Sequence, residues 1–178
     1  HQRASLIIRC FKCRNPVLLT KAYLVYVRPL LEYCSPVWSP VYIKDIALLE
    51  SVQRRFTKRI TGMNDLNYLQ RLKTLNLETL ESRRLKTDLI TMFKILNNLI
   101  AIDSHDFFGL STVVKTRGHR FKLIKPICKS NIRLFSFSCR RIYCWNSLTD
   151  NVVCCESIYS FKSRLNTVDL SDHLLLSF

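Results

Sequence analysis

The sequence predicts a mainly α-helical protein, and three observations carry that prediction. Glycine occurs only 3 times in 178 residues, which disfavours tight hairpins and nearly excludes glycine-rich phosphate loops. Hydrophobic residues make up 48% of the chain and charged residues 23%, enough for a packed core. Apolar residues recur at helical spacing in several segments. We expect a helical bundle, then a basic extended arm that could include short β-strands, then a small helical cap.

The first strong helix signal lies at Asn15-Pro16, where a capping side chain precedes a proline suited to the first turn. Pro29 removes a backbone donor, so we expect a kink or break near Arg28. Apolar residues keep helical spacing across this region, at Leu19, Tyr23, Tyr26 and Leu30.

Two Ser-Pro pairs follow, at 35–36 and 39–40. Residues before proline avoid helical angles, so these pairs predict an extended connection. Val37 and Trp38 lie between the pairs, and we expect them to anchor the connection on the core.

Three helices are expected next. In the first, Gln53 shares one face with apolar residues, and Gly62 stands where a stop is expected. A short helix carries an apolar stripe between Tyr68 and Leu75. A longer helix covers about 78–97, with Arg83 and Arg84 pointing away from its apolar stripe. The apolar face of the first helix holds Ile46, Leu49, Phe56 and Ile60, and that of the third holds Leu85, Leu89, Met92, Phe93 and Leu96.

The composition changes after residue 98. Residues 99–118 are expected to form a linker with glycine breaks, which separates a bundle at 1–98 from a basic arm and C-terminal helical segment at 119–178. The stretch "RFKLIKPI" fits a strand or an extended arm. Helix is expected at about 131–148, and Ser157 is expected to cap a final helix.

The charge balance points to a polyanionic partner. Lys and Arg number 28 against 13 Asp and Glu, a formal net charge of +15, and such a field favours nucleic acid through counterion release. The alternative is a solvated basic surface without a ligand. The expected nucleic-acid-binding residues are Arg54, Arg55, Lys58, Arg59, Arg83, Arg84, Lys115, Arg117, Arg120, Lys122 and Lys125.

Catalytic and metal-binding patterns are weak. The acids are dispersed, and the dense group Asp103, His105 and Asp106 fits a cap or turn better than a two-metal site. Cys10 and Cys13 have the spacing of half a zinc site, but no second pair matches, so buried apolar cysteines are the default. We expect a chain that is not an enzyme by itself, with no catalytic residue, metal or cofactor.

Membrane insertion is not expected, because Lys21, Arg28 and Glu32 interrupt the most apolar stretch. The chain opens on His1 without a signal-peptide layout, which favours a fragment with reduced thiols. We expect an intracellular location, in the nucleus and cytoplasm.

Five blocks in order carry a family resemblance over about residues 3–165. They are "YVRPLLEYCSPVWSP", "DIALLESVQRRFTKRITG", "LNLETLESRRLKTDLITMFKILNN", "TRGHRFKL", and "CWNSL" followed by "SIYSFKSRLN". Together they resemble the C-terminal region, beyond the palm, of LINE-type (non-LTR) retrotransposon reverse transcriptases of the jockey-like group. Thr149 stands where that family usually has proline.

The resemblance implies a thumb-like helical bundle that grips template and primer. The full-length relative would carry an endonuclease and a magnesium-dependent RNA-directed DNA polymerase, and would perform target-primed reverse transcription. The implied partners of this chain are RNA and DNA, as an RNA–DNA hybrid, and the palm domain of the same polymerase. The alternatives are an interaction module with exposed apolar surface around Val37 and Trp38, or a decayed, non-functional copy.

Overall fold

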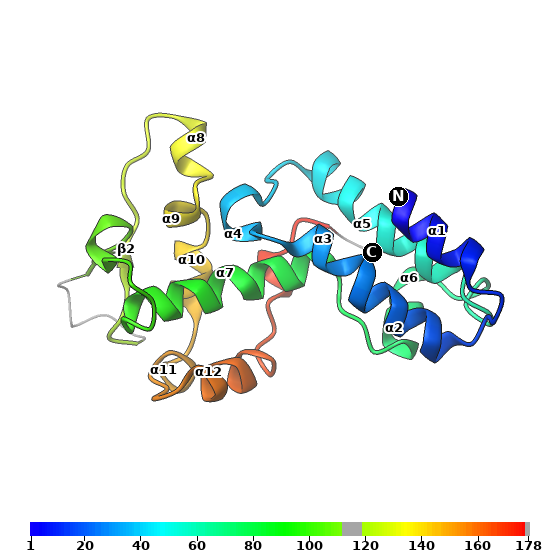
Figure 1. Ribbon diagram of the computed structural model, residues 1–178. Helices are drawn as coiled ribbons and strands as arrows, with labels where there is room; N and C mark the ends of the chain where they lie inside the picture. Colours follow the sequence, from blue (N-terminus) through cyan, green and yellow to red (C-terminus); the bar gives the residue numbers. More distant parts are fainter. Residues whose placement is uncertain (112–118, 177–178) are drawn as a thin grey trace. The chain divides into compact units, whose positions relative to one another are not determined.

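A computed structural model describes residues 1–111 and 119–176, and it confirms the mainly helical fold (Figure 1). The chain divides into two compact units. Unit 1 contains His1–Arg84 and the segment from Leu174, and unit 2 contains Leu85–His173. The division falls inside α7 (Leu80–Leu96), whereas the domains expected from the sequence change after residue 98.

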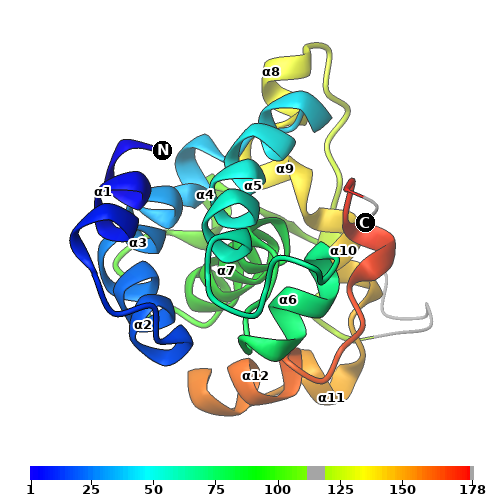
Figure 2. The same ribbon diagram turned by 90° about the vertical axis from the view of Figure 1, so that its right-hand side faces the viewer.

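Unit 1 is a small helical bundle. Helix α1 packs against α2 and α5, and α6 packs against the other side of α5 (Figure 2). Its apolar core collects residues such as Leu19, Tyr23, Phe56 and Ile60, all at most 3% exposed. Its helices are α1 (Gln2–Cys10), α2 (Pro16–Tyr26), α3 (Arg28–Glu32), α4 (Ser35–Trp38), α5 (Ile43–Lys58), α6 (Tyr68–Thr74) and the first turn of α7.

The start and the break predicted for the first strong helix are both confirmed. The Asn15 side chain accepts a hydrogen bond from the Val17 backbone N–H at 2.9 Å, which caps α2. Helix α2 then ends at Tyr26, and α3 begins at Arg28 with Pro29 in its first turn.

The extended connection predicted for the Ser-Pro pairs is only half correct. Residues Ser35–Trp38 form the short helix α4, because Cys34 takes a left-handed conformation (φ 52°) that lets Pro36 enter the first helical turn. Ser39 is extended as expected, with ψ 124°. Val37 and Trp38 do not anchor on the core: they are 83% and 41% exposed.

The next helices agree with the predicted apolar stripes. In α5, Ile46, Gln53 and Phe56 are buried, and the chain reaches Gly62 (φ 79°) after the helix ends. Helix α6 starts with a capping box in which the Asn67 side chain accepts from the Gln70 N–H and the Gln70 side chain accepts from the Asn67 N–H. Helix α7 is shared by the two units: its first residues belong to unit 1, and the rest of the helix belongs to unit 2.

Unit 2 wraps short elements around α7. The rings of Phe93 in α7 and Phe161 in α12 stack with centroids 4.3 Å apart, and Trp145 lies beside Phe161 at 6.1 Å. Ser157 caps α12 by accepting from the Ser160 N–H, as predicted. Its elements are η1 (Ser104–Asp106), β1 (Gly109–Leu110), β2 (Leu123–Ile124), α8 (Asn131–Leu134), α9 (Phe137–Arg140), α10 (Ile142–Ser147), α11 (Asp150–Val153), α12 (Ile158–Leu165) and η2 (Ser171–His173).

The sequence left a strand and an extended arm open for the basic arm, and the structure has a two-residue strand there. Strand β2 pairs antiparallel with β1, with Gly109 opposite Ile124 and Leu110 opposite Leu123. Among the described residues, no helix combines the length and the apolar character needed to cross a bilayer.

Candidate nucleic-acid interface

Helix α5 presents four cations to solvent. Arg54, Arg55, Lys58 and Arg59 are exposed, whereas Val52, Gln53, Phe56 and Thr57 between them are buried. Residues four apart lie on the same side of a helix, so these cations form two adjacent rows, with about 6 Å between the Cβ atoms of successive residues in a row. We call these four residues the α5 basic face.

Tyr68 supports one end of the α5 basic face. The Arg54 guanidinium lies 5.1 Å from the centre of the Tyr68 ring, and Arg71 lies 5.6 Å from it. Arg71 is itself buried and donates to the Thr57 hydroxyl at 3.3 Å. These contacts hold Arg54 against the bundle, so its charge is placed before any ligand arrives.

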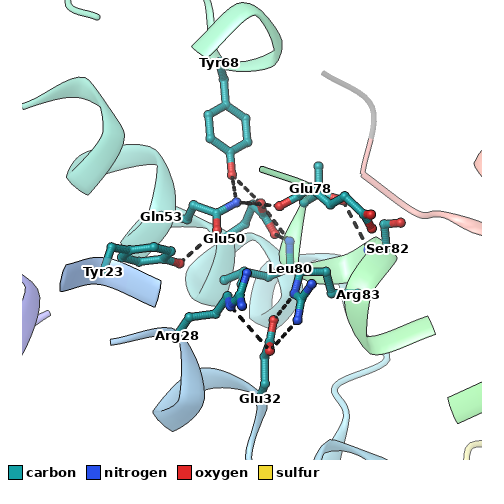
Figure 3. A network of polar contacts seen from close by, with 11 residues as sticks. Tyr23, Arg28, Glu32, Glu50, Gln53, Tyr68, Glu78, Leu80, Ser82 and Arg83 are labelled. Carbon is teal, nitrogen blue, oxygen red and sulfur yellow. Dashed lines mark hydrogen bonds and ion pairs between the residues drawn. The ribbon is translucent and has the colours of Figure 1, made fainter. Parts of the chain in front are cut away.

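The opposite side of α5 is fixed by a buried polar network (Figure 3). The Gln53 amide accepts from the Tyr23 hydroxyl at 2.9 Å and donates to the Tyr68 hydroxyl at 3.0 Å and to the Glu78 carbonyl at 2.9 Å. These bonds connect α2, α5 and α6 with Glu78, two residues before α7, and therefore fix the rotation of α5 about its axis. They determine which of its residues face solvent.

Glu50 extends that network to α7. Its carboxylate accepts from the Leu80 backbone N–H at 2.9 Å and from the Tyr68 hydroxyl. Glu50 is fully buried, and desolvation raises the pKa of its carboxyl group, although these hydrogen bonds act in the opposite direction. A carboxylate at a helix N-terminus satisfies a backbone donor that no residue of that helix can reach.

The two predicted cations at the start of α7 differ from the α5 basic face. Arg83 forms an ion pair with Glu32, in which its Nη2 donates to the carboxylate at 3.0 Å, and this bond raises the pKa of Arg83. Arg84 is only 1% exposed. This burial differs from the expectation that Arg84 points away from the apolar stripe, and it keeps Arg84 out of any exposed basic surface.

The basic arm is packed rather than free along its described part. The Trp145 indole N–H donates to the Phe121 carbonyl at 2.9 Å, and the His119 ring lies 3.0 Å from the Trp145 carbonyl oxygen. The side chain of Asn146 bonds to both backbone groups of Leu123. Residues 119–123 of the block "TRGHRFKL" therefore meet the block "CWNSL" in space.

The cations of the arm have separate surroundings. Arg120 is exposed and lies over the Phe121 ring at 4.9 Å, and the Lys125 ammonium lies 3.9 Å from the centre of the Tyr143 ring. Lys122 is half-buried. Lys115 and Arg117 lie outside the described residues. Arg120, Lys122 and Lys125 thus belong to unit 2, whereas the α5 basic face belongs to unit 1.

Two arginines, Arg140 and Arg141, pair with one buried acid. Asp88 in α7 receives the Arg140 guanidinium in a bidentate pair, at 2.8 and 3.0 Å, and accepts from Arg141 Nε at 3.2 Å. The Asp88 side chain is fully buried. These arginines hold α9 and α10 against α7, so their charges contribute to structure.

Two further acids accept hydrogen bonds from backbone groups. The Asp103 side chain accepts from the His105 N–H at 2.9 Å and caps η1, which confirms the predicted cap. Glu81 accepts from the backbone N–H groups of Leu175 and Leu176, at 2.7 and 3.1 Å. Within residues 1–111 and 119–176, no group of three or more His, Cys, Asp or Glu side chains is placed to hold a metal ion.

Sequence reasoning missed the buried polar residues that position the site. Glu50, Asp88 and Asn146 could have been suspected, because each lies within or beside an apolar stripe where a polar side chain needs a partner. Their partners could not have been identified, since they lie 18 to 53 residues away in the chain.

Comparison with known proteins finds a similar stretch in a protein without an assigned function. An uncharacterized protein of Caenorhabditis elegans, B0403.1, is 32% identical to this chain over 94 residues, which cover 51% of this chain. The chain spans about half the length of that relative, 48%. No family model matches the chain, and no solved structure does.

Proposed function

We propose that this chain is a noncatalytic part of a retrotransposon RNA-directed DNA polymerase, and that it grips an RNA–DNA hybrid through the α5 basic face. The observation that supports this most directly is the exposure of Arg54, Arg55, Lys58 and Arg59 in two rows on one rigid helix. The sequence resemblance supplies the polymerase, whose own palm would hold the catalytic carboxylates and magnesium. This proposal includes a location in the nucleus and cytoplasm, where such a partner would be found.

Phosphate recognition explains why such a surface needs no catalytic group. Each cation that neutralises a phosphate releases a condensed counterion, so affinity depends on salt and not on base sequence. The α5 basic face is fixed by the Gln53 and Glu50 bonds on the opposite side of the helix, which lowers the entropy lost on binding. Arg120 and Lys122 offer a second set of phosphate contacts on unit 2.

The test is fluorescence anisotropy of the chain with a labelled RNA–DNA hybrid across a salt series. Replacing the four residues of the α5 basic face by alanine should reduce the slope of log affinity against log salt by about 3. The matched control replaces four exposed lysines of the same unit, which removes equal charge from other surfaces. They are Lys12, Lys21, Lys44 and Lys73.

Equal losses in the two variants would show that net charge alone drives binding and that α5 is not the contact surface. Unchanged affinity in the α5 variant would also contradict the proposal. No binding of the parent chain at low salt would favour a piece that needs the rest of its polymerase, or a decayed copy.

A second candidate function, an interaction module that packs against the palm of the same polymerase, is favoured by one observation. Around α3 and α4, Tyr33 is 76% exposed, Val37 83% and Tyr42 57%. Contiguous exposed apolar residues typically mark protein interfaces. Co-expression with the palm should raise the soluble yield of the chain, and Val37→Ser with Trp38→Ser should abolish that gain. A chain equally soluble in either case would exclude this second function.

A further inference from the structure

Two cysteine thiols of unit 2 face each other. The sulfur atoms of Cys128 and Cys139 lie 3.8 Å apart. Cys128 is half-buried in the segment that follows β2, and Cys139 is buried in α9. No spacing in the sequence suggests this pairing, since the two residues belong to different elements and resemble no known two-cysteine motif.

We propose that Cys128 and Cys139 are a redox modification site, which closes to an intramolecular disulfide when the chain meets an oxidised low-molecular-weight disulfide such as oxidised glutathione. The Cys128 thiolate attacks one glutathione sulfur and displaces one glutathione thiolate, which leaves a mixed disulfide. The Cys139 thiolate then attacks the sulfur of Cys128 and displaces the second glutathione. Two electrons pass to glutathione, and the two thiol protons end on the released glutathione thiols or in solvent.

The geometry needs only a small movement. A disulfide bond is about 2.0 Å long, so the sulfurs must approach by about 1.8 Å from their present separation. The Arg140–Asp88 pair holds α9 and Cys139 against α7, whereas Cys128 lies in a segment without regular structure and can move toward Cys139. The pair therefore differs from thiols held apart by rigid helices.

The order of attack follows from access. Cys128 is the more accessible of the two thiols, and Lys125 and Arg133 place positive charge near it. Burial and the hydrogen bond to Cys139 nevertheless raise the pKa of Cys128, so the thiolate fraction is small at neutral pH. The disulfide should form slowly at pH 7 and faster at pH 9.

Closure would restrain a basic loop. The residues between the two cysteines include all of α8, together with Lys129 and Arg133, which are both exposed. A disulfide across this loop reduces the freedom of the unfolded chain, and thus stabilises the folded unit. Oxidation would hold these two cations in one arrangement, whether or not the α5 basic face binds nucleic acid.

Peptide mapping of the full chain tests the proposal directly. The native protein is equilibrated in glutathione buffers of rising oxidised fraction, its free thiols are alkylated, and it is digested with trypsin. Because trypsin does not cut between Lys125 and Pro126, Cys128 lies in peptide 123–129 and Cys139 in peptide 134–140, with no other cysteine in either. The expected product is these two peptides joined, and dithiothreitol should separate them.

Variants and a second measurement keep the result interpretable. Cys128→Ser should abolish the joined peptides, whereas Cys144→Ala should leave them unchanged, since burial raises the pKa of Cys144 to about 11 and keeps that thiol unreactive. Oxidation should raise the thermal midpoint of the parent by about 5 °C, and should not raise that of Cys128→Ser. Separate glutathione adducts on Cys128 and Cys139, or joined peptides found only after unfolding in guanidinium, would overturn the proposal.

Discussion

The side-chain amide of Asn146 forms two hydrogen bonds with the backbone of Leu123. The Leu123 N–H donates to Asn146 Oδ1 at 2.9 Å, and Asn146 Nδ2 donates to the Leu123 carbonyl at 2.8 Å. A side chain thus replaces a neighbouring strand beside β2, which has β1 on its other side. This pairing explains how a two-residue strand stays ordered, since isolated two-stranded ribbons are only marginally stable in water.

Asn146→Ala should destabilise the protein by about 1 to 3 kcal/mol, because it leaves both backbone groups of the buried Leu123 without these partners. Urea unfolding measures the loss. Asn151→Ala, at an exposed position of α11, is the matched control and should change stability by less than about 0.5 kcal/mol. Equal effects at the two positions would mean that the amide pairing contributes nothing specific.

His119 should make stability depend on pH. Burial lowers the pKa of His119, against the opposing effect of its bond to the Trp145 carbonyl. The unfolded chain then binds the proton more tightly than the folded one, so stability is lost as the pH falls below the ordinary histidine value of about 6.5. Unfolding free energies from pH 8 to 5 should show this fall in the parent.

The variant His119→Gln should flatten that pH dependence, because glutamine does not titrate. His105→Gln, at an exposed position of η1, is the control and should retain the parent profile. If His119→Gln kept the full slope between pH 7 and 5, another group would be responsible.

Local signals predicted much of the fold. Asn15 and Ser157 cap the helices that they were expected to cap, and the apolar stripe of α5 was read correctly, because these features depend on neighbours within one or two turns. The α4 segment was misread for a local reason as well. The left-handed conformation of Cys34 is rare for a residue other than glycine, and no sequence pattern predicts it.

The candidate site was predicted less completely. The α5 basic face follows from periodicity, and all four of its cations are exposed. The position of Arg84 away from the apolar stripe predicts that it faces solvent, but its side chain is buried. Periodicity shows which residues share a face of a helix. It cannot show how many of the helix's faces are buried by other parts of the protein.

Asp88 should be among the most costly residues to remove. Asp88→Ala leaves Arg140, whose side chain is 6% exposed, without its carboxylate, and should cost about 3 to 5 kcal/mol. Asp88→Asn keeps the shape and one acceptor, so it should cost less. Thermal and urea unfolding test this order. Asp172→Ala, at an exposed position, is the control, and a loss at Asp88 no larger than at Asp172 would contradict the structural role of the pair.

Two substitutions of Glu50 distinguish the contribution of its hydrogen-bond acceptor to stability from that of its buried charge. Glu50→Ala leaves the Leu80 N–H and the Tyr68 hydroxyl without this acceptor, and should cost about 2 to 4 kcal/mol. Glu50→Gln keeps an acceptor and removes the charge, so it should cost less at neutral pH.

The two Glu50 variants should also differ from the parent in how stability changes with pH. Desolvation raises the pKa of Glu50, so the folded chain holds this proton more tightly than the unfolded one. The stabilisation is complete below the unfolded glutamate value of about 4.3, and is lost as the pH rises through the folded pKa. The stability of the parent relative to Glu50→Gln should therefore decrease from pH 4 upward, as measured by urea unfolding. A difference that increased with pH would mean that the bonds to Leu80 and Tyr68 outweigh desolvation, and that Glu50 stabilises α7 as a carboxylate.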